Sequence, residues 1–426
     1  MVHGLKKINK EAFDILVILS KLAHKKGARL YLIGGSVRDI ILGTNSNIDL
    51  DIVVEDDAIS FAEHVASHFK CEIKKHETFR TATVFVPNHK VDFATARNEE
   101  YKKPGALPTV SVSHLKDDMA RRDFTINTMA VDLNEKTFGE LIDICGGQKD
   151  LKSKVLRALH DASFTDDATR ILRGIRFENR FGFKFESHTL KLAKDAIKKR
   201  ALLNIHPHRL YDEMKLILDE PDPVKCLKRV DDICGFDFLS NEIKFDKDDV
   251  LLLRRIAKVL KTYRAKILDK RKITEWLVYF SVLTYKLPKR TLSSMLKLYG
   301  FKKGEELILL SINKHLKAMA KLKKLSTPSK IFKILDLFSY EAILFFLAYY
   351  YEDKNIAGNI QLFLEELSGI KVMVRGSDLI RLNIVPVRIY GKLLEALLYA
   401  KIDKRLKDKS AEISEIMKIY KKLGIQ

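Results

Sequence analysis

The chain has 426 residues and a formal net charge of +21, with 77 Lys and Arg residues against 56 Asp and Glu residues. Its 46% hydrophobic and 31% charged residues indicate a globular, soluble chain of about two to four domains. The longest apolar stretches, such as residues 342–351, are too short to cross a bilayer, which excludes a membrane-spanning protein. The excess of basic residues favours a polyanionic partner, with nucleic acid as the first candidate, or else serves solubility or heat adaptation.

Cysteine usage and the N-terminal segment point to a compartment. The four cysteines are widely separated and form no CxxC pair, which argues against a zinc site or a disulfide framework. The first residues lack the apolar core of a signal sequence. We therefore expect a cytoplasmic protein.

The first predicted element is an amphipathic helix over residues 9–26. After it, Gly34 and Gly35 end a short apolar strand, and a second helix runs to residue 42. A glycine turn that feeds a helix N-terminus lets backbone N–H groups approach a phosphate, and Arg38 adds a guanidinium. The turn either binds a nucleotide phosphate or is only a tight turn.

Two aspartates, Asp49 and Asp51, stand in the apolar run 48–54. In a strand this spacing places both carboxylates on the same face. Two such carboxylates repel each other unless a cation lies between them, and Mg²⁺ takes carboxylate oxygens together with substrate phosphates. The pair therefore predicts a metal site for phosphoryl or nucleotidyl transfer, unless it is a solvated loop. The sequence has neither GxGxxG nor a Walker A loop.

The next segments mix helix and strand signals. A helix is expected over residues 58–69, and strands are expected over residues 71–73, 81–86 and 91–96. They lack a regular βαβ repeat, so a small mixed sheet covered by helices is predicted rather than a doubly wound sheet.

Asp92 lies in the third of these strands, flanked by apolar residues. It is the candidate for a further carboxylate that binds a metal or accepts the proton of a primer hydroxyl, unless it is an ordinary sheet-edge aspartate. Residues 98–114 are predicted to form a loop that either clamps a substrate or merely connects two elements.

A further cluster of polar residues lies in the segment 117–133. Arg121 and Arg122 are placed to approach a triphosphate. Asp123 and Asn127 could hydrogen-bond a ribose hydroxyl, and a carboxylate that accepts from a 2′-OH would favour ribonucleotides. The alternative is a surface ion pair at the start of a helix.

Beyond a Gly-Gly turn the chain is predicted to be helical almost throughout. Asp166 and Asp167 are expected at a helix start, and Arg170, Arg173 and Arg176 follow at i+3 intervals. Asp167 and Arg170 would lie on one helical face, either as an intrahelical ion pair or as a base-selecting pair. A carboxylate acceptor beside a guanidinium donor matches the pairing edges of cytosine and adenine and rejects those of uracil and guanine.

The chain resembles the class II tRNA nucleotidyltransferases, the CCA-adding enzymes, and their relatives the bacterial poly(A) polymerases. The segments that carry the resemblance are IGGSVRDIILG with DLD, RRDFTINTMA, LHDASFTDDATRILRGIRFENRFGF and HRLYDEMKLIL. The resemblance implies an α+β fold, in which a polymerase-β-type nucleotidyltransferase head with a mixed sheet precedes an all-α neck, body and tail. The implied domains cover residues 1–150, 151–220, 221–345 and 346–426.

The resemblance also implies residue roles. The positions matching Asp49 and Asp51 bind Mg²⁺, and those matching Gly35, Arg38 and Arg122 contact the nucleotide. The positions matching Asp167 and Arg170 pair with the incoming base, with Arg173 and Arg176 in support and Arg209 and Glu213 bracing the neck.

Two positions depart from the family pattern. Asp166 stands where the family usually has Glu, and it keeps the charge on a shorter side chain. Val387 replaces the glycine of a Pro-Gly turn in the tail motif, which puts the local turn in doubt but not the domain.

The implied activity is template-independent addition of CMP and AMP from CTP and ATP to the 3′ end of tRNA. Addition of A alone or of CC alone remains an alternative, because the motifs are shared. A poly(A) polymerase is less favoured, because ETFRTATV stands where such enzymes carry a Gly-Arg-Arg-Phe-like segment. A non-catalytic RNA-binding relative is a further alternative, although both aspartates are present.

Overall fold

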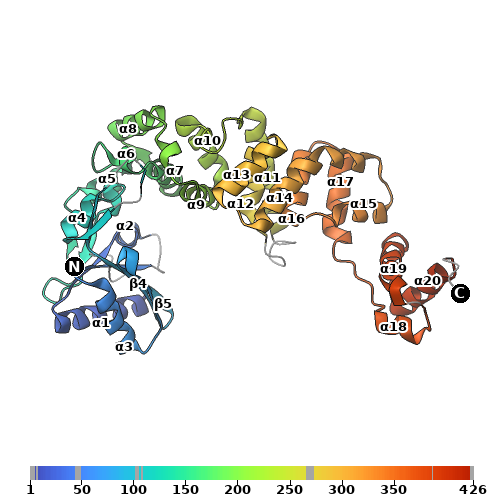
Figure 1. Cartoon of the computed structure of the whole chain (residues 1–426), viewed down its shortest axis with the longest axis horizontal. Coiled ribbons are helices and arrows are strands. Elements are labelled where there is room, and N and C mark those ends of the chain that lie inside the picture. Colours follow the sequence, from blue (N-terminus) through green and yellow to red (C-terminus); the bar gives the residue numbers. More distant parts are fainter. Residues whose placement is uncertain are drawn as a thin grey trace. The chain divides into compact units, whose positions relative to one another are not determined.

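The computed structural model describes residues 5, 8–43, 49–100, 105–106, 109–264, 273–385 and 387–422. The chain divides into two units, Met1–Phe238 and Leu239–Gln426, and each is considered by itself (Figure 1). The first unit combines a sheet with helices, and the described part of the second unit is helical. The mixed α+β class is thus confirmed, whereas the finer division into four domains stays a prediction.

The first unit is built on a seven-stranded sheet with the order β3-β4-β5-β2-β1-β8-β9. β2 and β5 are parallel, and the other neighbouring strands are antiparallel. The predicted mixed sheet is therefore confirmed. The strands are β1 (Arg29–Ile33), β2 (Leu50–Glu55), β3 (Ile73–His76), β4 (Thr81–Val86), β5 (His89–Thr95), β8 (Ala130–Asp132) and β9 (Leu141–Ile142).

Three helices near the N-terminus form where capping and periodicity predict them. α1 (Lys10–Lys26) buries its apolar face and ends at Gly27, whose φ of 69° favours glycine. α2 (Gly35–Leu42) ends in the same way at Gly43, with φ 66°. α3 (Ala58–Phe69) begins at Asp57, whose side chain accepts from the N–H groups of residues 59 and 60.

The structure corrects several predicted boundaries around the sheet. The strand expected over 71–73 lies at Ile73–His76, and the strand expected to begin at residue 91 begins at His89. Residues 98–114 do not form a simple loop: β6 (Arg97–Glu100) and β7 (Thr109–Val112) pair as an antiparallel ribbon. The Thr-Val-Ser-Val sequence of β7 has β-branched residues that favour a strand. Residues 101–104 and 107–108 of the expected loop lie outside the described residues.

Helices connect the sheet to the rest of the first unit. They are α4 (Leu115–Ala120), α5 (Gly147–Ser153), α6 (Ser163–Asp166), α7 (Thr169–Phe181), α8 (Ser187–Lys198), α9 (Pro207–Leu218) and α10 (Pro223–Cys234). Short 3-10 turns lie at Glu77–Phe79, Thr125–Asn127 and Ala201–Asn204. A short parallel pair, β10 (Val155–Leu156) and β11 (Lys184–Phe185), was not predicted from the sequence.

Close packing holds α7 against its surroundings. Gly174 faces Phe185 and Phe124, and a Cβ atom on Gly174 would lie 2.3 Å from the Phe185 ring. Both rings are buried, and they lie 6.0 Å apart between centroids. The glycine therefore fixes how near α7 lies to these rings, and with it the position of the arginines along α7.

The second unit is an array of helices. The helices are α11 (Lys247–Arg264), α12 (Glu275–Thr284), α13 (Lys289–Tyr299), α14 (Lys303–His315), α15 (Pro328–Leu335), α16 (Tyr340–Tyr349), α17 (Lys354–Leu362), α18 (Gly376–Arg381), α19 (Tyr390–Lys404) and α20 (Lys409–Lys422). A 3-10 segment (Leu316–Lys324), a π-helical turn (Phe363–Leu367) and a 3-10 turn (Val387–Ile389) join them. α12 and α16 are buried along nearly their whole length and form the centre of the array.

The last helices, α18 to α20, share a small core of their own, which includes Leu379, Leu393, Leu397 and Ile416. Val387, at the position of the family's turn glycine, begins a 3-10 turn. Within the described residues of the whole chain, no helix combines the length and apolar character that crossing a membrane requires.

Candidate active site

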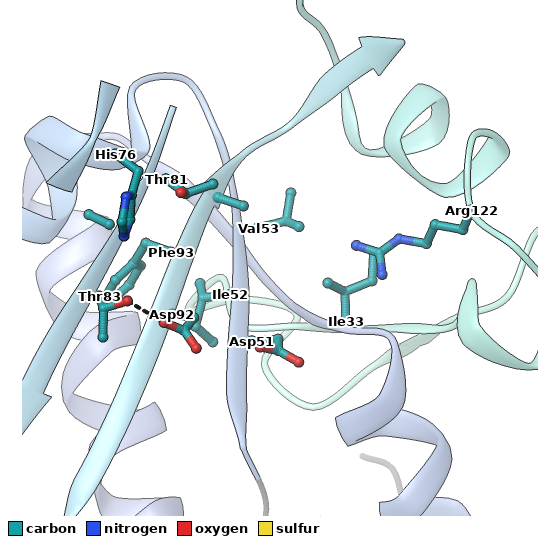
Figure 2. Close-up of a pocket in the computed structure, with 12 residues that line it drawn as sticks. Ile33, Asp51, Ile52, Val53, His76, Thr81, Thr83, Asp92, Phe93 and Arg122 are labelled. Atoms are coloured by element: carbon teal, nitrogen blue, oxygen red, sulfur yellow. Dashed lines mark hydrogen bonds between the residues drawn. The ribbon is translucent and has the colours of Figure 1, made fainter. Parts of the chain in front are cut away.

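Two of the predicted carboxylates lie directly opposite each other in the sheet. Asp51 on β2 is the register partner of Asp92 on β5. Since paired residues of a sheet share a face, the two side chains project from the same face of neighbouring strands, whose backbones lie about 4.8 Å apart. Figure 2 shows them side by side, with the Arg122 guanidinium on the other side of Asp51. β5 lies between β4 and β2, so Asp92 is not a sheet-edge residue.

The third carboxylate, Asp49, is exposed and precedes β2, which begins at Leu50. The prediction that both Asp49 and Asp51 lie within the strand is therefore wrong by one residue. Ser36 fixes this point of the chain, because its hydroxyl donates to the Asp49 carbonyl oxygen at 2.7 Å. Burial, the Asp92 charge and the Asp49 charge together raise the pKa of Asp51 above its usual value.

Asp92 is held at both of its carboxylate oxygens. The Thr83 hydroxyl donates to Oδ1 at 2.5 Å, and the Lys90 ammonium donates to Oδ2 at 2.6 Å. Thr83 is the register partner of Asp92 on β4, and Lys90 lies two residues before Asp92 on the same strand face. Neither partner was predicted from the sequence, although the i, i+2 spacing of Lys90 and Asp92 could have indicated the ion pair.

Two cavities meet at Asp51. One, of about 430 Å³, extends along the sheet face, and its polar lining residues are Asp51, His76, Thr81, Thr83, Asp92 and Arg122 (Figure 2). The other, of about 480 Å³, is lined by Gly35, Arg38, Asp51, Glu99, Arg121, Arg122, Asp123, Asn127, Asp167, Arg170, Arg173, Arg176, Phe177 and Arg180. The second cavity thus brings together most of the predicted nucleotide-binding residues.

Gly34 allows Arg122 to approach the glycine turn. The backbone of Gly34 has φ 79°, a conformation that favours glycine. A Cβ atom there would lie 2.8 Å from an Arg122 guanidinium nitrogen. The Gly34 N–H itself donates to the Met129 carbonyl oxygen, so Gly34 contributes space for the guanidinium rather than a donor.

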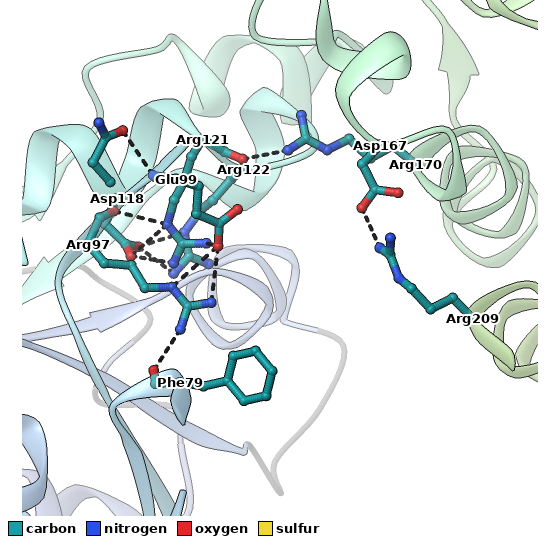
Figure 3. Close-up of polar contacts among 10 residues, drawn as sticks. Phe79, Arg97, Glu99, Asp118, Arg121, Arg122, Asp167, Arg170 and Arg209 are labelled. Atoms are coloured by element: carbon teal, nitrogen blue, oxygen red, sulfur yellow. Dashed lines mark hydrogen bonds and ion pairs between the residues drawn. The ribbon is translucent and has the colours of Figure 1, made fainter. Parts of the chain in front are cut away.

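The guanidinium of Arg122 is oriented by Asp118, a residue that the sequence did not single out. Asp118 is completely buried and accepts from Arg122 at 2.9 Å and from Arg121. Burial acts to raise the pKa of Asp118, but the charges of Arg122 and Arg121 outweigh it and lower the pKa. Arg121 also bonds Glu99 on β6 at 2.6 Å (Figure 3). Arg121 therefore ties α4 to the β6–β7 ribbon.

Arg38, Asn127, Asp123 and Arg173 form a chain of contacts along the second cavity. Arg38 donates to Asn127 Oδ1 at 2.7 Å, and Asn127 donates to Asp123 Oδ1 at 2.9 Å. Arg173 donates to Asp123 Oδ2 at 2.9 Å, and its charge lowers the pKa of Asp123 although burial opposes this. Since both Asp123 oxygens already accept bonds, a direct bond to a ribose hydroxyl would add to these contacts or replace one.

Asp167 and Arg170 line the same cavity but do not pair with each other (Figure 3). Asp167 has an extended backbone, with φ −145°, and lies between α6 and α7. The prediction that it lies on one helical face with Arg170 is therefore wrong, and so is the alternative of an intrahelical ion pair. Asp166 likewise ends the short helix α6 instead of opening α7. The spacing of Asp167 and Thr169 could have shown this, because the Asp167 side chain accepts from the Thr169 N–H.

The side chains of Asp167 and Arg170 each form hydrogen bonds with other residues. Asp167 Oδ2 accepts from Arg209 at 2.6 Å, and Oδ1 accepts from the Thr169 hydroxyl at 2.6 Å. Arg170 donates to the Ser163 hydroxyl at 2.8 Å and to the Arg121 carbonyl oxygen at 2.7 Å. A carboxylate has about four acceptor positions and a guanidinium five donors, so both groups keep capacity for a ligand.

Further along α7, ion pairs join this helix to α9 and to Glu220, which follows α9. Arg173 and Arg176 lie 3.4 and 3.8 Å from Glu213, and Arg176 and Arg180 lie 3.8 and 3.2 Å from Glu220. Burial raises the pKa of Glu213, although Arg173 and Arg176 oppose the shift. The Nε atom of Arg176 and Oε2 of Glu213 are buried without a hydrogen-bond partner. Arg173 and Arg176 on α7 thus contact Glu213 on α9, and their supporting roles stay a prediction.

The carboxylate site suits a hard divalent cation that also takes ligands from a substrate. Among the described residues, no group of three or more His, Cys, Asp or Glu side chains is arranged to hold a metal ion. Mg²⁺ in proteins is commonly held by one or two carboxylates, waters and substrate phosphates. Burial and then the charges of Asp92 and Asp49 raise the pKa of Asp51, and a cation would offset those charges. The donor set therefore fits Mg²⁺.

Comparisons with known proteins place the chain in a family. Residues 30–157 match the model of the poly A polymerase head domain. An A-adding tRNA nucleotidyltransferase of Geobacter sulfurreducens is 36% identical over 90% of this chain and 44% of the relative. A solved CCA-adding enzyme in an apo form is 30% identical with a TM-score of 0.81, over 97% of this chain and 96% of that chain. The Thermotoga maritima CCA-adding enzyme complexed with tRNA is 29% identical with a TM-score of 0.78, over 97% of each chain.

The head fold, with opposed carboxylates beside an arginine-lined cavity, is that of a nucleotidyltransferase. The chain belongs to the family of tRNA nucleotidyltransferases and poly(A) polymerases. It spans about half the length of the curated relatives it matches, from 41 to 53% of three A-adding enzymes.

Proposed function

We propose that the protein adds CMP and AMP from CTP and ATP to the 3′ end of tRNA without a nucleic-acid template and releases pyrophosphate. The observation that carries this proposal is the position of Asp51 where two cavities meet. Joining a nucleoside triphosphate to an RNA end requires two binding sites that converge on one reacting centre. The arginine-rich cavity suits the triphosphate, and the cavity along the sheet face suits the RNA end.

Nucleotidyltransferase families generally use divalent metal ions. We infer that Asp49 and Asp51 hold Mg²⁺ here, because they supply carboxylate oxygens beside the arginine-rich cavity. When bound, Mg²⁺ would stabilise negative charge on the phosphates and on the departing pyrophosphate.

The protein's own side chains position the two reactants. Arg122, oriented by Asp118, and Arg38, oriented by Asn127, hold the triphosphate through charge-assisted hydrogen bonds. The Arg38 guanidinium also lies 4.5 Å from the centre of the Phe181 ring, which restricts its movement. Asp92, on the sheet-face cavity, accepts the proton of the terminal ribose hydroxyl as this oxygen attacks the α-phosphate.

Asp167 and Arg170 select the base in this proposal. The carboxylate accepts from the amino group of cytosine or adenine, and the guanidinium donates to the adjacent ring nitrogen. Uracil and guanine present a carbonyl beside N–H, so they would leave both protein groups mispaired. Since Arg209 and Ser163 hold the two side chains apart from each other, no ion pair between them has to break before a base binds.

Addition of A alone is the second candidate, and one observation favours it. Among the curated sequences, three A-adding relatives match 90%, 53% and 81% of this chain, and a CC-adding relative and a CCA-adding enzyme of Bacillus pumilus match 50% and 49%. By structure, however, a CCA-adding enzyme matches 97% of the chain. The carboxylates and the base-selecting pair serve both activities equally.

The proposed partner is tRNA, consistent with the net charge of +21, and the proposed compartment is the cytoplasm.

The test is incorporation of labelled CTP and ATP, each alone and then together, into tRNAs that end before CCA, after C and after CC. Addition of C, C and A to the shortest tRNA establishes the full activity. Addition of A only to the tRNA ending in CC establishes the restricted activity. If a folded protein supplied with Mg²⁺ adds neither nucleotide to any of the three, the proposed function is wrong.

A further inference from the structure

Lys90 places a positive charge beside Asp92, and the proposed reaction has not used it. Its ammonium lies 2.6 Å from Asp92 Oδ2. Its side chain is 56% exposed, so the ammonium can leave Asp92 for solvent without crossing packed atoms. The Lys90 ammonium therefore pairs with Asp92 in the ligand-free protein and can turn into solvent when a ligand binds.

The site needs such a charge when no metal is bound. Asp51 and Asp92 are opposed in register, and Asp49 lies two residues before Asp51, so up to three negative charges gather here. Thr83 already holds Asp92 Oδ1, and Lys90 holds Oδ2. Both oxygens that could serve an incoming ligand are thus occupied in the ligand-free protein, one by a neutral hydroxyl and one by a cation.

We propose that Lys90 is a resident counter-cation, a positioning residue that neutralises Asp92 until a divalent metal and nucleotide enter and then releases it. The proposal rests on the metal site of the proposed function. Lys90 opposes metal binding, because its charge at Asp92 Oδ2, on the strand beside Asp51, repels another cation. Removal of the Lys90 charge should therefore strengthen metal binding and lower the stability of the metal-free protein.

Binding of Mn²⁺ to the full chain without nucleotide tests this directly, with free Mn²⁺ measured by electron paramagnetic resonance. We expect Lys90→Gln to lower the half-saturating Mn²⁺ concentration roughly three- to tenfold, and Lys90→Arg to leave it near the wild-type value. Lys75→Gln is the matched control, because Lys75 is a lysine of the same sheet that pairs with Glu63 instead of the carboxylate site. It should leave Mn²⁺ binding unchanged.

A second readout uses thermal unfolding. In EDTA, Lys90→Gln should melt below wild type, and Mn²⁺ should reduce or reverse the difference. In an Asp92→Asn background, Lys90→Gln should have a much smaller effect on Mn²⁺ binding, because Lys90 has lost its partner. If Lys90→Gln binds Mn²⁺ no more tightly than wild type and Lys75→Gln, Lys90 is only a solvated strand residue. If wild type and Lys90→Gln both bind no Mn²⁺, the metal site of the proposed function fails together with this inference.

Discussion

At the scale of single residues, the negative charge that Asp51 carries for the proposed reaction lowers the stability of the folded protein. Burial and two neighbouring carboxylates raise its pKa, so the folded protein resists its ionisation more than the unfolded chain does. Well below a pH of about 4, Asp51 is protonated in both the folded and the unfolded state, so it does not lower the free energy of unfolding. As the pH rises from there through the raised pKa, the unfolded chain gains more from ionisation, and folded stability is lost.

Replacing Asp51 with asparagine should therefore stabilise the metal-free protein at neutral pH. The reason is that the amide removes a charge that the fold disfavours while keeping the shape of the side chain. We expect a melting temperature in EDTA above wild type at pH 7, with the difference shrinking as the pH falls below 5. An unchanged or lower melting temperature at pH 7 would show that the fold does not disfavour the Asp51 charge.

Arg209 has a different role, because it holds one base-selecting side chain without lining the cavity. Its replacement by glutamine removes a charged donor from Asp167, an effect of about 1–3 kcal/mol for a charge-assisted bond. We expect kcat/KM for ATP and CTP to fall roughly five- to hundredfold, with weaker discrimination against UTP and GTP. Arg229→Gln is the matched control, because Arg229 pairs with Glu178 and not with Asp167. Equal losses in the two variants would mean that Arg209 only stabilises the fold.

Sequence reasoning brought the principal residues of the site together but assigned some of their partners wrongly. Asp51, Asp92 and Arg122 were predictable, because their chemistry and spacing suit nucleotidyl transfer. The partners Glu99 and Thr83 were not predictable, because a contact made only through the fold has no fixed spacing in the sequence. Asp118 was missed although it lies three and four residues before Arg121 and Arg122, a helical ion-pair spacing. The intrahelical ion pair between Asp167 and Arg170 was wrong, because α7 begins at Thr169, after Asp167.

At the scale of elements, Gly174 controls the packing of α7 against Phe185 and Phe124. Gly174→Ala would force a Cβ atom into the Phe185 ring, a case of overpacking that costs about 1–3 kcal/mol. We expect a lower midpoint of urea unfolding and lower activity, because α7 carries Arg170 and Arg173.

Gly304→Ala is the control for this prediction. Gly304 lies in the first turn of α14 with open space around a Cβ atom, so alanine there should leave stability unchanged or raise it slightly. A Gly174→Ala protein as stable as the Gly304→Ala protein would contradict the close packing of α7.

The elements that the sequence predicted well are those with local signals. α1, α2 and α3 have caps or a glycine stop at their ends, and β4 has an alternating apolar pattern that matches its bounds. The β6–β7 ribbon was missed because Arg97–Glu100 is entirely polar and is stabilised by pairing and by the Arg121–Glu99 contact. The two-residue strands β10 and β11 are too short to carry any periodicity.

At the scale of the whole molecule, the net charge of +21 predicts binding dominated by phosphate contacts. Each neutralised phosphate releases a counterion, so the logarithm of the tRNA association constant should fall linearly with the logarithm of salt concentration. Six to ten such contacts would reduce affinity by about 10³- to 10⁵-fold between 50 and 200 mM salt. Fluorescence anisotropy of labelled tRNA over this range measures the slope, and Asp51→Asn should share it. Affinity that does not change with salt would contradict an electrostatic interface.

The central claim is that the opposed carboxylates Asp51 and Asp92 carry out nucleotidyl transfer. The most direct test is the single-turnover rate of AMP addition to a tRNA ending in CC, by wild type, Asp51→Asn and Asp92→Asn, with tRNA affinity measured in parallel. We predict losses of at least roughly 10³-fold for Asp51→Asn and 10²-fold for Asp92→Asn, with tRNA affinity unchanged. An Asp51→Asn protein that adds AMP within tenfold of the wild-type rate would contradict the claim.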